Sequence, residues 1–185
     1  MSIIWDAMDQ TKCCIPHFKL QNKAWVKDTK KLQMQYGAFI VHGHGTYAYC
    51  WDDRVKKDGD MWATLLLQTI LKLYKQYKDK GMKWPETLYL QADNASDNKN
   101  LAMYAVCQLL RDLGIFKKVK LSFLPVGHTH EDIDACFGAL ARQLNANSVY
   151  TMEELEKLWL QAWPSLNSCC YVEVSVDDCF ISWRI

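Results

Sequence analysis

The chain has 185 residues, of which half are hydrophobic and 12% are aromatic, and this composition excludes a disordered tail. Its 22 basic residues nearly balance 21 acidic ones, so the net charge of +1 carries no electrostatic signature of nucleic-acid binding. The length fits one folded domain with room for a small appendage.

Targeting and cysteine features favour an intracellular protein. The first ten residues, MSIIWDAMDQ, lack the basic start and the long apolar core of a signal peptide. The longest strongly apolar run, ATLLLQTI, is too short to cross a bilayer, so we expect no membrane partner. We therefore interpret the eight cysteines as reduced thiols. The sequence has no Cys-x-x-Cys pair, which gives a structural zinc site little support.

The N-terminal part of the chain predicts three strands. An apolar run ending at Asp6 is typical of a short strand, and the polar stretch that follows, with Pro16, indicates an irregular connection. Aromatic and β-branched residues then predict two strands, at 32–41 and 46–51, joined by a glycine-rich turn. Three strands in succession favour an antiparallel meander.

Helices and strands alternate through the rest of the chain. Apolar spacing predicts, in order, helix 61–80, strand 87–92, helix 100–113, strand 118–126, helix 131–144 and helix 152–163. We expect Asp60 to cap the first of these helices and Gly114 to end the second. Thr151 and Glu154 have the spacing of a capping box for the last helix. The segments YVEVSV and CFISWRI predict two closing strands.

The order β-β-β-α-β-α-β-α predicts an α/β fold with a mixed sheet flanked by helices. The later β-α-β units require parallel pairing, which a meander alone does not provide. The same element order characterises the ribonuclease H-like fold. We therefore expect a core over residues 1–145, with a C-terminal helix and strands over 146–185 that are packed on this core or appended to it.

Acidic residues fall at three places in this order. They are Asp6 with the nearby Asp9, Asp93 at the end of the fourth strand, and Glu131, Asp132 and Asp134 at the start of the third helix. The first and fourth strands of a mixed sheet can lie side by side, and a helix start can overhang them. Clustered carboxylates repel one another unless a cation neutralises them, and Mg²⁺ or Mn²⁺ is the hard ion that suits oxygen ligands. Two such ions about 4 Å apart activate a water and stabilise the leaving oxygen of a phosphodiester.

Each acid also has an ordinary interpretation, which the sequence leaves open. Asp6 could end a strand in solvent, and Asp93 could start a turn. The acids of the third helix could simply favour the positive end of the helix dipole. Within that last group we choose Asp134, because on a 3.6-residue period it lies beside the buried stripe, with Gly138 one turn later.

Polar residues near these acids are candidates for substrate binding. Asn94, Asn98 and Lys99 follow the second acid and could orient a phosphate, although Asn98 and Lys99 are also typical of a plain helix start. His128 and His130 precede the third helix and could hold a carboxylate or a phosphate, or simply order their loop. Zinc binding by His-x-His pairs with nearby cysteines is an alternative, but no third and fourth ligands have a recognisable spacing.

Three blocks carry a family resemblance: WDAMDQTKCCIPHF, LYLQADNASDNKN and LSFLPVGHTHEDIDACFG. They resemble an uncharacterised domain family of transposon-like eukaryotic genes, whose members read roughly as DGMDQ, L-x-x-DN-x-x-x-NKN and SF-x-x-VGHTH-x-x-D. The resemblance covers roughly residues 4–145. The family looks related to DDE/D transposases and integrases, which have a ribonuclease H-like catalytic core. The resemblance implies that Asp6, Asp93 and Asp134 are the first, second and third metal-binding acids.

The resemblance sets the functional expectation and its alternatives. It implies a nuclear protein that uses Mg²⁺ or Mn²⁺ to cleave or transfer phosphodiesters of a nucleic acid, with DNA as the expected partner. Transposases usually carry a separate DNA-binding region, and none is visible here, so we expect DNA contact to depend on a region outside this chain. The first alternative is a transposase-derived binding or interaction module without catalysis. The second is a zinc-binding module.

Overall fold

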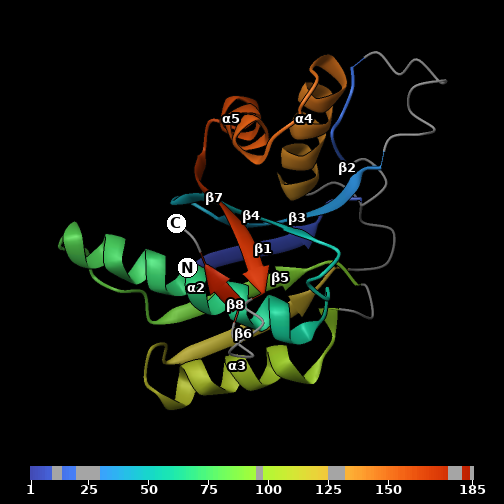
Figure 1. The fold of residues 1–185 in the computed structure, drawn as a ribbon. Coiled ribbons are helices and arrows are strands. Elements are labelled where there is room, and N and C mark those ends of the chain that lie inside the picture. Colours follow the sequence, from blue (N-terminus) through green and yellow to red (C-terminus); the bar gives the residue numbers. More distant parts are fainter. Residues whose placement is uncertain (10–13, 20–29, 95–97, 125–131, 175–180, 184–185) are drawn as a thin grey trace. The chain divides into compact units, whose positions relative to one another are not determined.

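The computed structural model describes residues 1–9, 14–19, 30–94, 98–124, 132–174 and 181–183 (Figure 1). These residues form an α/β fold with a mixed sheet, as the sequence predicts. The chain divides into two compact units, each assembled from three stretches. The first unit comprises Met1–Asp6, Phe39–His44 and Lys56–Thr129, and the second comprises Ala7–Ala38, Gly45–Val55 and His130–Ile185. Within the described ranges, no helix has the length and hydropathy needed to span a membrane.

Three parallel strands form the sheet of the first unit. They are β1 (Ser2–Ala7), β5 (Thr87–Ala92) and β6 (Lys118–Phe123), hydrogen-bonded in the order β6-β5-β1. The register of β1 and β5 runs from Ser2 opposite Tyr89 to Trp5 opposite Ala92. The expectation that the first and fourth predicted strands can be neighbours is therefore confirmed.

The strand β6 lies at one end of the order of the described strands, and β8 lies at the other. Burial alternates along β6, so that Lys118, Lys120 and Ser122 are exposed. The Lys120 ammonium lies 5.0 Å from the ring centroid of Tyr89 on the neighbouring strand. One face of this part of the sheet is therefore polar and charged.

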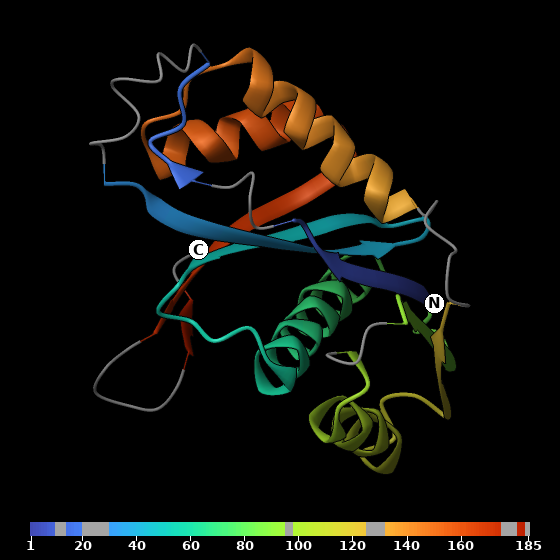
Figure 2. The ribbon, with the colours of Figure 1, turned by 90° about the vertical axis from the view of Figure 1, so that its right-hand side faces the viewer.

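Two helices complete the first unit, α2 (Gly59–Asp79) and α3 (Leu101–Asp112), which pack against each other (Figure 2). The predicted cap of α2 was wrong: Asp58, with extended backbone, accepts a hydrogen bond from the Met61 amide at 3.1 Å. Asp60 instead lies in the first helical turn, where its negative charge interacts favourably with the positive end of the helix dipole. The predicted end of α3 is confirmed, since Gly114 follows it with a φ of 71°.

The core of the first unit joins β1, β3 (Leu32–Val41) and α2 through three aromatic rings. The rings of Trp5 and Phe39 are stacked with centroids 6.5 Å apart, and Phe39 meets Trp62 edge-on at 5.7 Å. All three side chains are at most 2% exposed. This cluster fixes β1, which carries the first predicted acid, against α2.

The second unit contains most of β3, the strand β4 (Gly45–Asp52) and the C-terminal strands β7 (Leu166–Val174) and β8 (Ile181–Trp183). The strands follow the order β3-β4-β7-β8, with β7 parallel to β4 and antiparallel to β8. β7 begins five residues before the predicted strand YVEVSV, because Leu166 already pairs with Thr46. The segment predicted to be irregular contains a two-residue strand, β2 (Cys14–Ile15), on β3.

The first three long strands are ordered as a meander. Strand β1 is antiparallel to β3. The His42 amide donates to the Ser2 carbonyl, and the Met8 amide donates to the Tyr36 carbonyl. β3 and β4 are consecutive neighbours joined by a tight turn, in which the His44 amide donates to the Val41 carbonyl. The predicted meander is confirmed.

Two helices belong to the second unit, α4 (Asp132–Ala146) and α5 (Met152–Ala162), and they pack together. The capping box of Thr151 and Glu154 at the start of α5 is confirmed. Trp159 of α5 is buried edge-on against Tyr36 of β3, with ring centroids 5.3 Å apart. Cys136 of α4 is fully buried, and burial raises the pKa of its thiol to about 11, so the thiol stays protonated.

Candidate functional site

Two of the predicted acids stand at the same end of neighbouring strands. The register of β1 and β5 ends with Trp5 opposite Ala92, and the next residues along the chain are Asp6 and Asp93. Neighbouring strands lie about 4.8 Å apart, so this register puts the two residues side by side. Both are half-buried. Parallel pairing is what creates this juxtaposition, because it brings the carboxyl ends of both strands to one edge.

The second acid is held by a buried amide. The Asn98 side chain, 6% exposed, donates a hydrogen bond from Nδ2 to Oδ1 of Asp93. The backbone beside Asp93 is fixed as well, since the Leu124 amide donates to the Ala92 carbonyl at 3.0 Å. A carboxylate tied in this way keeps one orientation, which a metal ligand requires.

The helix-start interpretation of Asn98 is wrong, because another residue has that role. Asn100 is the N-cap of α3, and its Oδ1 accepts from the Met103 amide at 2.9 Å. Lys99 is exposed, with its ammonium 5.5 Å from the ring centroid of Phe123 on β6. Asn94 directly follows Asp93 and is half-buried. The sequence alone does not predict the bond from Asn98 to Asp93, because a side-chain contact across five residues follows neither a helical nor a strand period.

The remaining predicted acids belong to the second unit or fall outside the described residues. Asp132 and Asp134 both lie in the first turn of α4 and are exposed, as the helix-dipole interpretation also expects. Asp9 is exposed shortly after β1. The predicted site residues His128, His130 and Glu131 lie outside the described residues. Among the residues that the structure describes, no three His, Cys, Asp or Glu side chains gather into a metal-binding group.

The pair Asp6 and Asp93 nevertheless fits a hard divalent ion. Mg²⁺ usually takes one or two protein carboxylates and completes its shell with waters and substrate phosphate. Aspartates at the matching ends of two neighbouring strands provide oxygen ligands of that kind, and the Asn98 amide holds the Asp93 carboxylate. The donor set does not suit a structural zinc ion, which prefers sulfur and imidazole ligands.

The first His-x-His pair makes hydrogen bonds to other side chains. His42 Nδ1 lies 3.2 Å from the Ser2 hydroxyl, and His44 Nε2 lies 2.7 Å from the Tyr77 hydroxyl. Burial lowers the pKa of His44, and the positive charges of the N-terminus and Lys80 lower it further. Burial raises the pKa of Tyr77. Both groups are therefore neutral near pH 7. The hydrogen bond between His44 and Tyr77 joins the β3–β4 turn to α2.

The depressed pKa of His44 predicts a loss of stability in acid. The unfolded chain takes up its proton near the ordinary value of 6.5, whereas the folded protein resists protonation until a lower pH. Stability should therefore be fully present above pH 6.5 and decline as the pH falls through the folded-state pKa. Thermal melts in a series of buffers check this slope. His44→Gln should make stability depend less on pH, whereas His42→Gln on the same turn should leave the pH dependence unchanged. Equal pH dependence in wild type and both variants would contradict the role of His44.

One buried acid that the sequence analysis did not select is structural. Asp52 ends β4 with a side chain 1% exposed, and it accepts from the Arg54 backbone amide at 2.9 Å. The Arg54 guanidinium also binds it in bidentate fashion, donating from Nε to Oδ1 at 3.0 Å and from Nη2 to Oδ2 at 2.5 Å. A carboxylate neutralised so completely by its own turn has little capacity left for a metal.

Comparison with known proteins gives a family. Among curated proteins none matches this sequence. One family model, described as a Domain of unknown function (DUF7869), matches residues 25–179. The matched span contains Asp93 and Asp134, begins after Asp6, and includes the helix α5 and the strand β7. The chain therefore belongs to the DUF7869 family of domains of unknown function.

Proposed function

We propose that this chain is a ribonuclease H-like domain related to transposases and integrases, which uses a divalent metal to cleave or transfer phosphodiesters of a nucleic acid. The observation that supports it most is the parallel register of β1 and β5, in which Asp6 and Asp93 are neighbours. The strand order gives further support. A meander of β1, β3 and β4, extended beyond β1 by parallel β5 and β6, is the arrangement expected of such a core.

The residues have separate roles in the proposed site. Asp6 and Asp93 would hold the metal, and Asn98 keeps the Asp93 carboxylate in place. Asp134 is proposed as the third acid on the sequence motif alone. The bound metal supplies activation of a water or a 3′ hydroxyl and neutralises charge on the leaving oxygen. Asn94 and Lys99 follow the second acid and are proposed to contact the substrate phosphate, as are His128 and His130.

The test is a thermal titration with Mn²⁺ and Mg²⁺. Binding to the folded protein alone stabilises it by about 2.7 kcal/mol at a metal concentration of 100 Kd. We expect wild type to show this gain and Asp93→Asn to lack it. Without metal, Asp93→Asn should be at least as stable as wild type, because it removes a negative charge beside a second acid on the neighbouring strand. This second result distinguishes a lost ligand from a damaged fold.

A matched control and a nucleic-acid assay complete the test. Asp79→Asn makes the same change at an exposed acid on α2 in the same unit, and it should keep the wild-type metal response. Cleavage of labelled single- and double-stranded DNA in Mn²⁺ should depend on Asp6, Asp93 and Asp134. If wild type and Asp93→Asn ignore the metal equally, the nuclease proposal fails.

The second candidate function is a transposase-derived binding module without catalysis. The near balance of 22 basic and 21 acidic residues favours it, since a domain that holds nucleic acid by itself is usually more basic. A protein that binds Mn²⁺ at Asp93 but cleaves no nucleic acid in any form would support this candidate. The zinc-binding alternative predicts bound zinc in the purified protein, and metal analysis tests it.

A further inference from the structure

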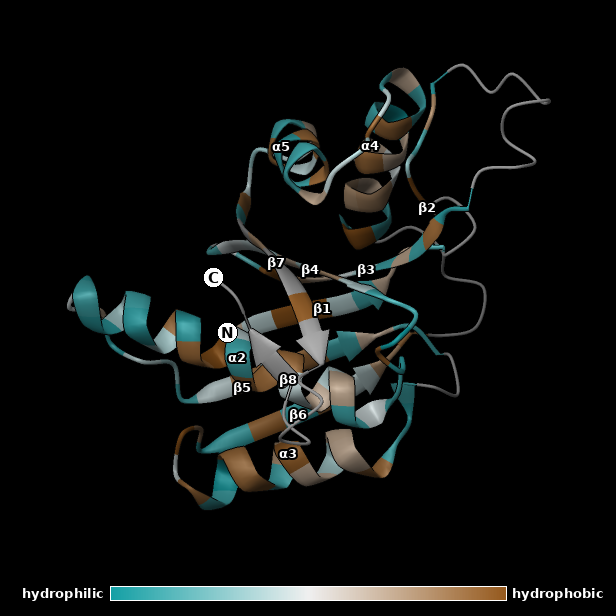
Figure 3. Ribbon diagram, in the orientation of Figure 1, coloured by the Kyte–Doolittle hydropathy of each residue, from teal (hydrophilic) through white to brown (hydrophobic). Residues whose placement is uncertain are grey.

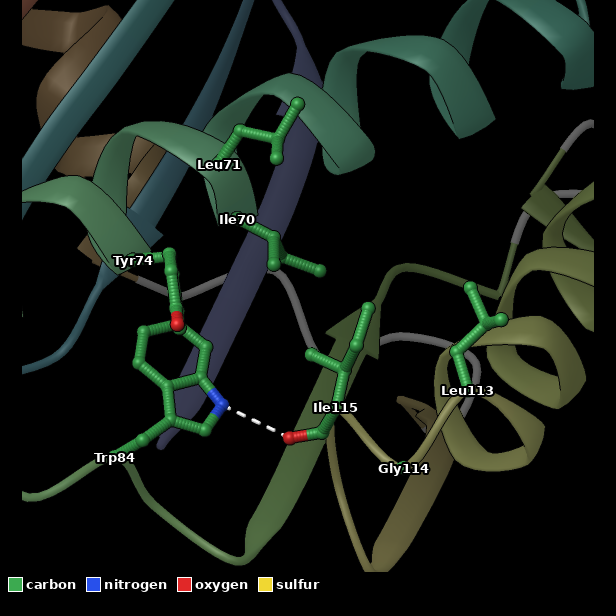
Figure 4. A pocket seen from close by; sticks show the side chains of 7 residues that line it. All are labelled: Ile70, Leu71, Tyr74, Trp84, Leu113, Gly114 and Ile115. Carbon is green, nitrogen blue, oxygen red and sulfur yellow. Dashed lines mark hydrogen bonds between the residues drawn. The ribbon is translucent and has the colours of Figure 1, made fainter.

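A second concave site lies in the first unit, at the other end of β5 and β6 from Asp93. It is a pocket of about 390 Å³ in volume. One wall is the middle of α2, through Ile70, Leu71 and Tyr74. The opposite wall is the connection between α3 and β6, and Trp84, just before β5, closes the side between them (Figure 4). The volume falls in the range typical of small-ligand and side-chain pockets, roughly 300–1,000 Å³.

The pocket wall is apolar, and its Trp84 ring is held in place by neighbouring groups. Trp84 donates from Nε1 to the Ile115 carbonyl at 2.9 Å, so its polar group is already satisfied (Figure 4). Its ring packs edge-on against Tyr74 and Tyr77, at centroid distances of 5.4 and 5.0 Å. The remaining lining is aliphatic except for the Tyr74 hydroxyl and backbone. An occupant would therefore gain by apolar contact and would find few hydrogen-bond partners.

The rim of the pocket exposes large apolar side chains. Leu71 and Leu113 are each 66% exposed, and Tyr74 is 53% exposed. Single exposed leucines are ordinary on protein surfaces, but three large apolar side chains around one hollow form a contiguous patch. Such a patch beside a preformed pocket is typical of a docking site for an apolar side chain of another molecule.

The surface beside the pocket is strongly basic. Between residues 71 and 84 the chain has five lysines, at 72, 75, 78, 80 and 83, against a single acid, Asp79. The whole chain has 22 basic and 21 acidic residues, so this excess is local. Lys75 is four residues after Leu71 and Lys78 four after Tyr74, so both lysines share the exposed helix face with the rim. Figure 3 shows the C-terminal end of α2 as predominantly hydrophilic.

We propose that this pocket docks an acidic peptide segment of a partner protein. A bulky apolar side chain of the peptide fills the hollow beside Trp84, and its flanking Asp or Glu residues meet Lys75 and Lys78. A nucleic-acid base fits less well, because its polar edges would find few hydrogen-bond partners in this lining, where the Trp84 Nε1 is already bonded to the Ile115 carbonyl. A lipid surface fits less well, because it has no side chain to insert into a concave site. The inference is independent of the metal site.

Random-peptide display on the intact chain tests the proposal. We expect selected peptides to combine one bulky apolar residue with flanking acids. Fluorescence anisotropy of a labelled selected peptide then measures affinity, which should weaken as salt rises. Leu113→Glu should weaken binding about tenfold or more. The new carboxylate at the rim repels the acidic residues of the peptide, and the longer side chain blocks the pocket. The double change Lys75→Glu and Lys78→Glu should also weaken it about tenfold.

Matched variants on α5 serve as controls. Leu160 is 45% exposed and Lys157 is exposed, so Leu160→Glu and Lys157→Glu repeat the two kinds of change in the second unit and should bind as wild type does. Unchanged thermal midpoints confirm that each variant folds. The proposal is overturned if no peptide is enriched over the Leu113→Glu protein, or if the enriched peptides lack acids. It is equally overturned if single-stranded DNA or phosphatidylserine vesicles bind through the same residues and displace the peptide.

Discussion

Asn98→Ala is expected to bind Mn²⁺ about 10- to 100-fold more weakly than wild type, the usual cost of removing a group that orients a metal ligand. The Asn98 amide is 6% exposed and donates to the Asp93 carboxylate, so its loss lets that carboxylate rotate and leaves a half-buried acceptor with one fewer donor. The missing bond should also cost about 1–3 kcal/mol of folding stability. Isothermal titration calorimetry measures the affinity, and urea unfolding measures the stability.

The neighbouring asparagine provides the control for this prediction. Asn100→Ala removes the N-cap of α3 and should cost about 1 kcal/mol of stability, while leaving the affinity for Mn²⁺ unchanged. The two variants therefore separate the orientation of Asp93 from the general stability of this segment. Equal affinities in Asn98→Ala and wild type would show that the buried amide does not position the ligand.

Phe39→Ala is expected to lower the free energy of unfolding by about 3–5 kcal/mol, the usual cost of removing a buried aromatic ring. Phe39 is fully buried between Trp5 of β1 and Trp62 of α2, at centroid distances of 6.5 and 5.7 Å. Both neighbours are rigid bicyclic rings on regular elements, so they close the resulting cavity poorly. Chemical denaturation followed by circular dichroism measures the loss.

An exposed aromatic residue of the same unit is the comparison for Phe39. Tyr104 on α3 is 48% exposed, and Tyr104→Ala should change stability by less than about 0.5 kcal/mol. A cost below about 1.5 kcal/mol for Phe39→Ala would mean that Trp5 and Trp62 move together to fill the space. Because Trp5 directly precedes Asp6, such movement should also alter the response to Mn²⁺.

Periodic patterns accounted for most of the predicted elements. The stripe of α2 and the apolar run of β5 have enough repeats to give element type and approximate bounds, and the βαβ logic then made β1 and β5 possible neighbours. Short or aperiodic features were predicted less well. The two-residue β2 has no period, and Asp58 and Asp60 are both acceptable caps until the backbone angles decide between them.

The side-chain contacts that build the two sites could not be predicted from local sequence patterns. The bond from Asn98 to Asp93 joins side chains five residues apart, a spacing that matches no helical or strand period. The pocket depends on Trp84 and Ile115, which lie in two different connections, each preceding a strand, and meet only because β5 and β6 are paired in parallel. Neither the contact between Asn98 and Asp93 nor the contact between Trp84 and Ile115 can be predicted from spacing along the chain.

The alternating lysines of β6 have a consequence for behaviour at high concentration. An outermost strand offers backbone groups with which a further chain can pair, and that is the usual start of fibrous aggregation. Lys118 and Lys120 place a positive charge at every second position there, so an incoming copy of the same strand meets like charges. The protein therefore resists growing its sheet by self-addition, without needing another element to cover that edge.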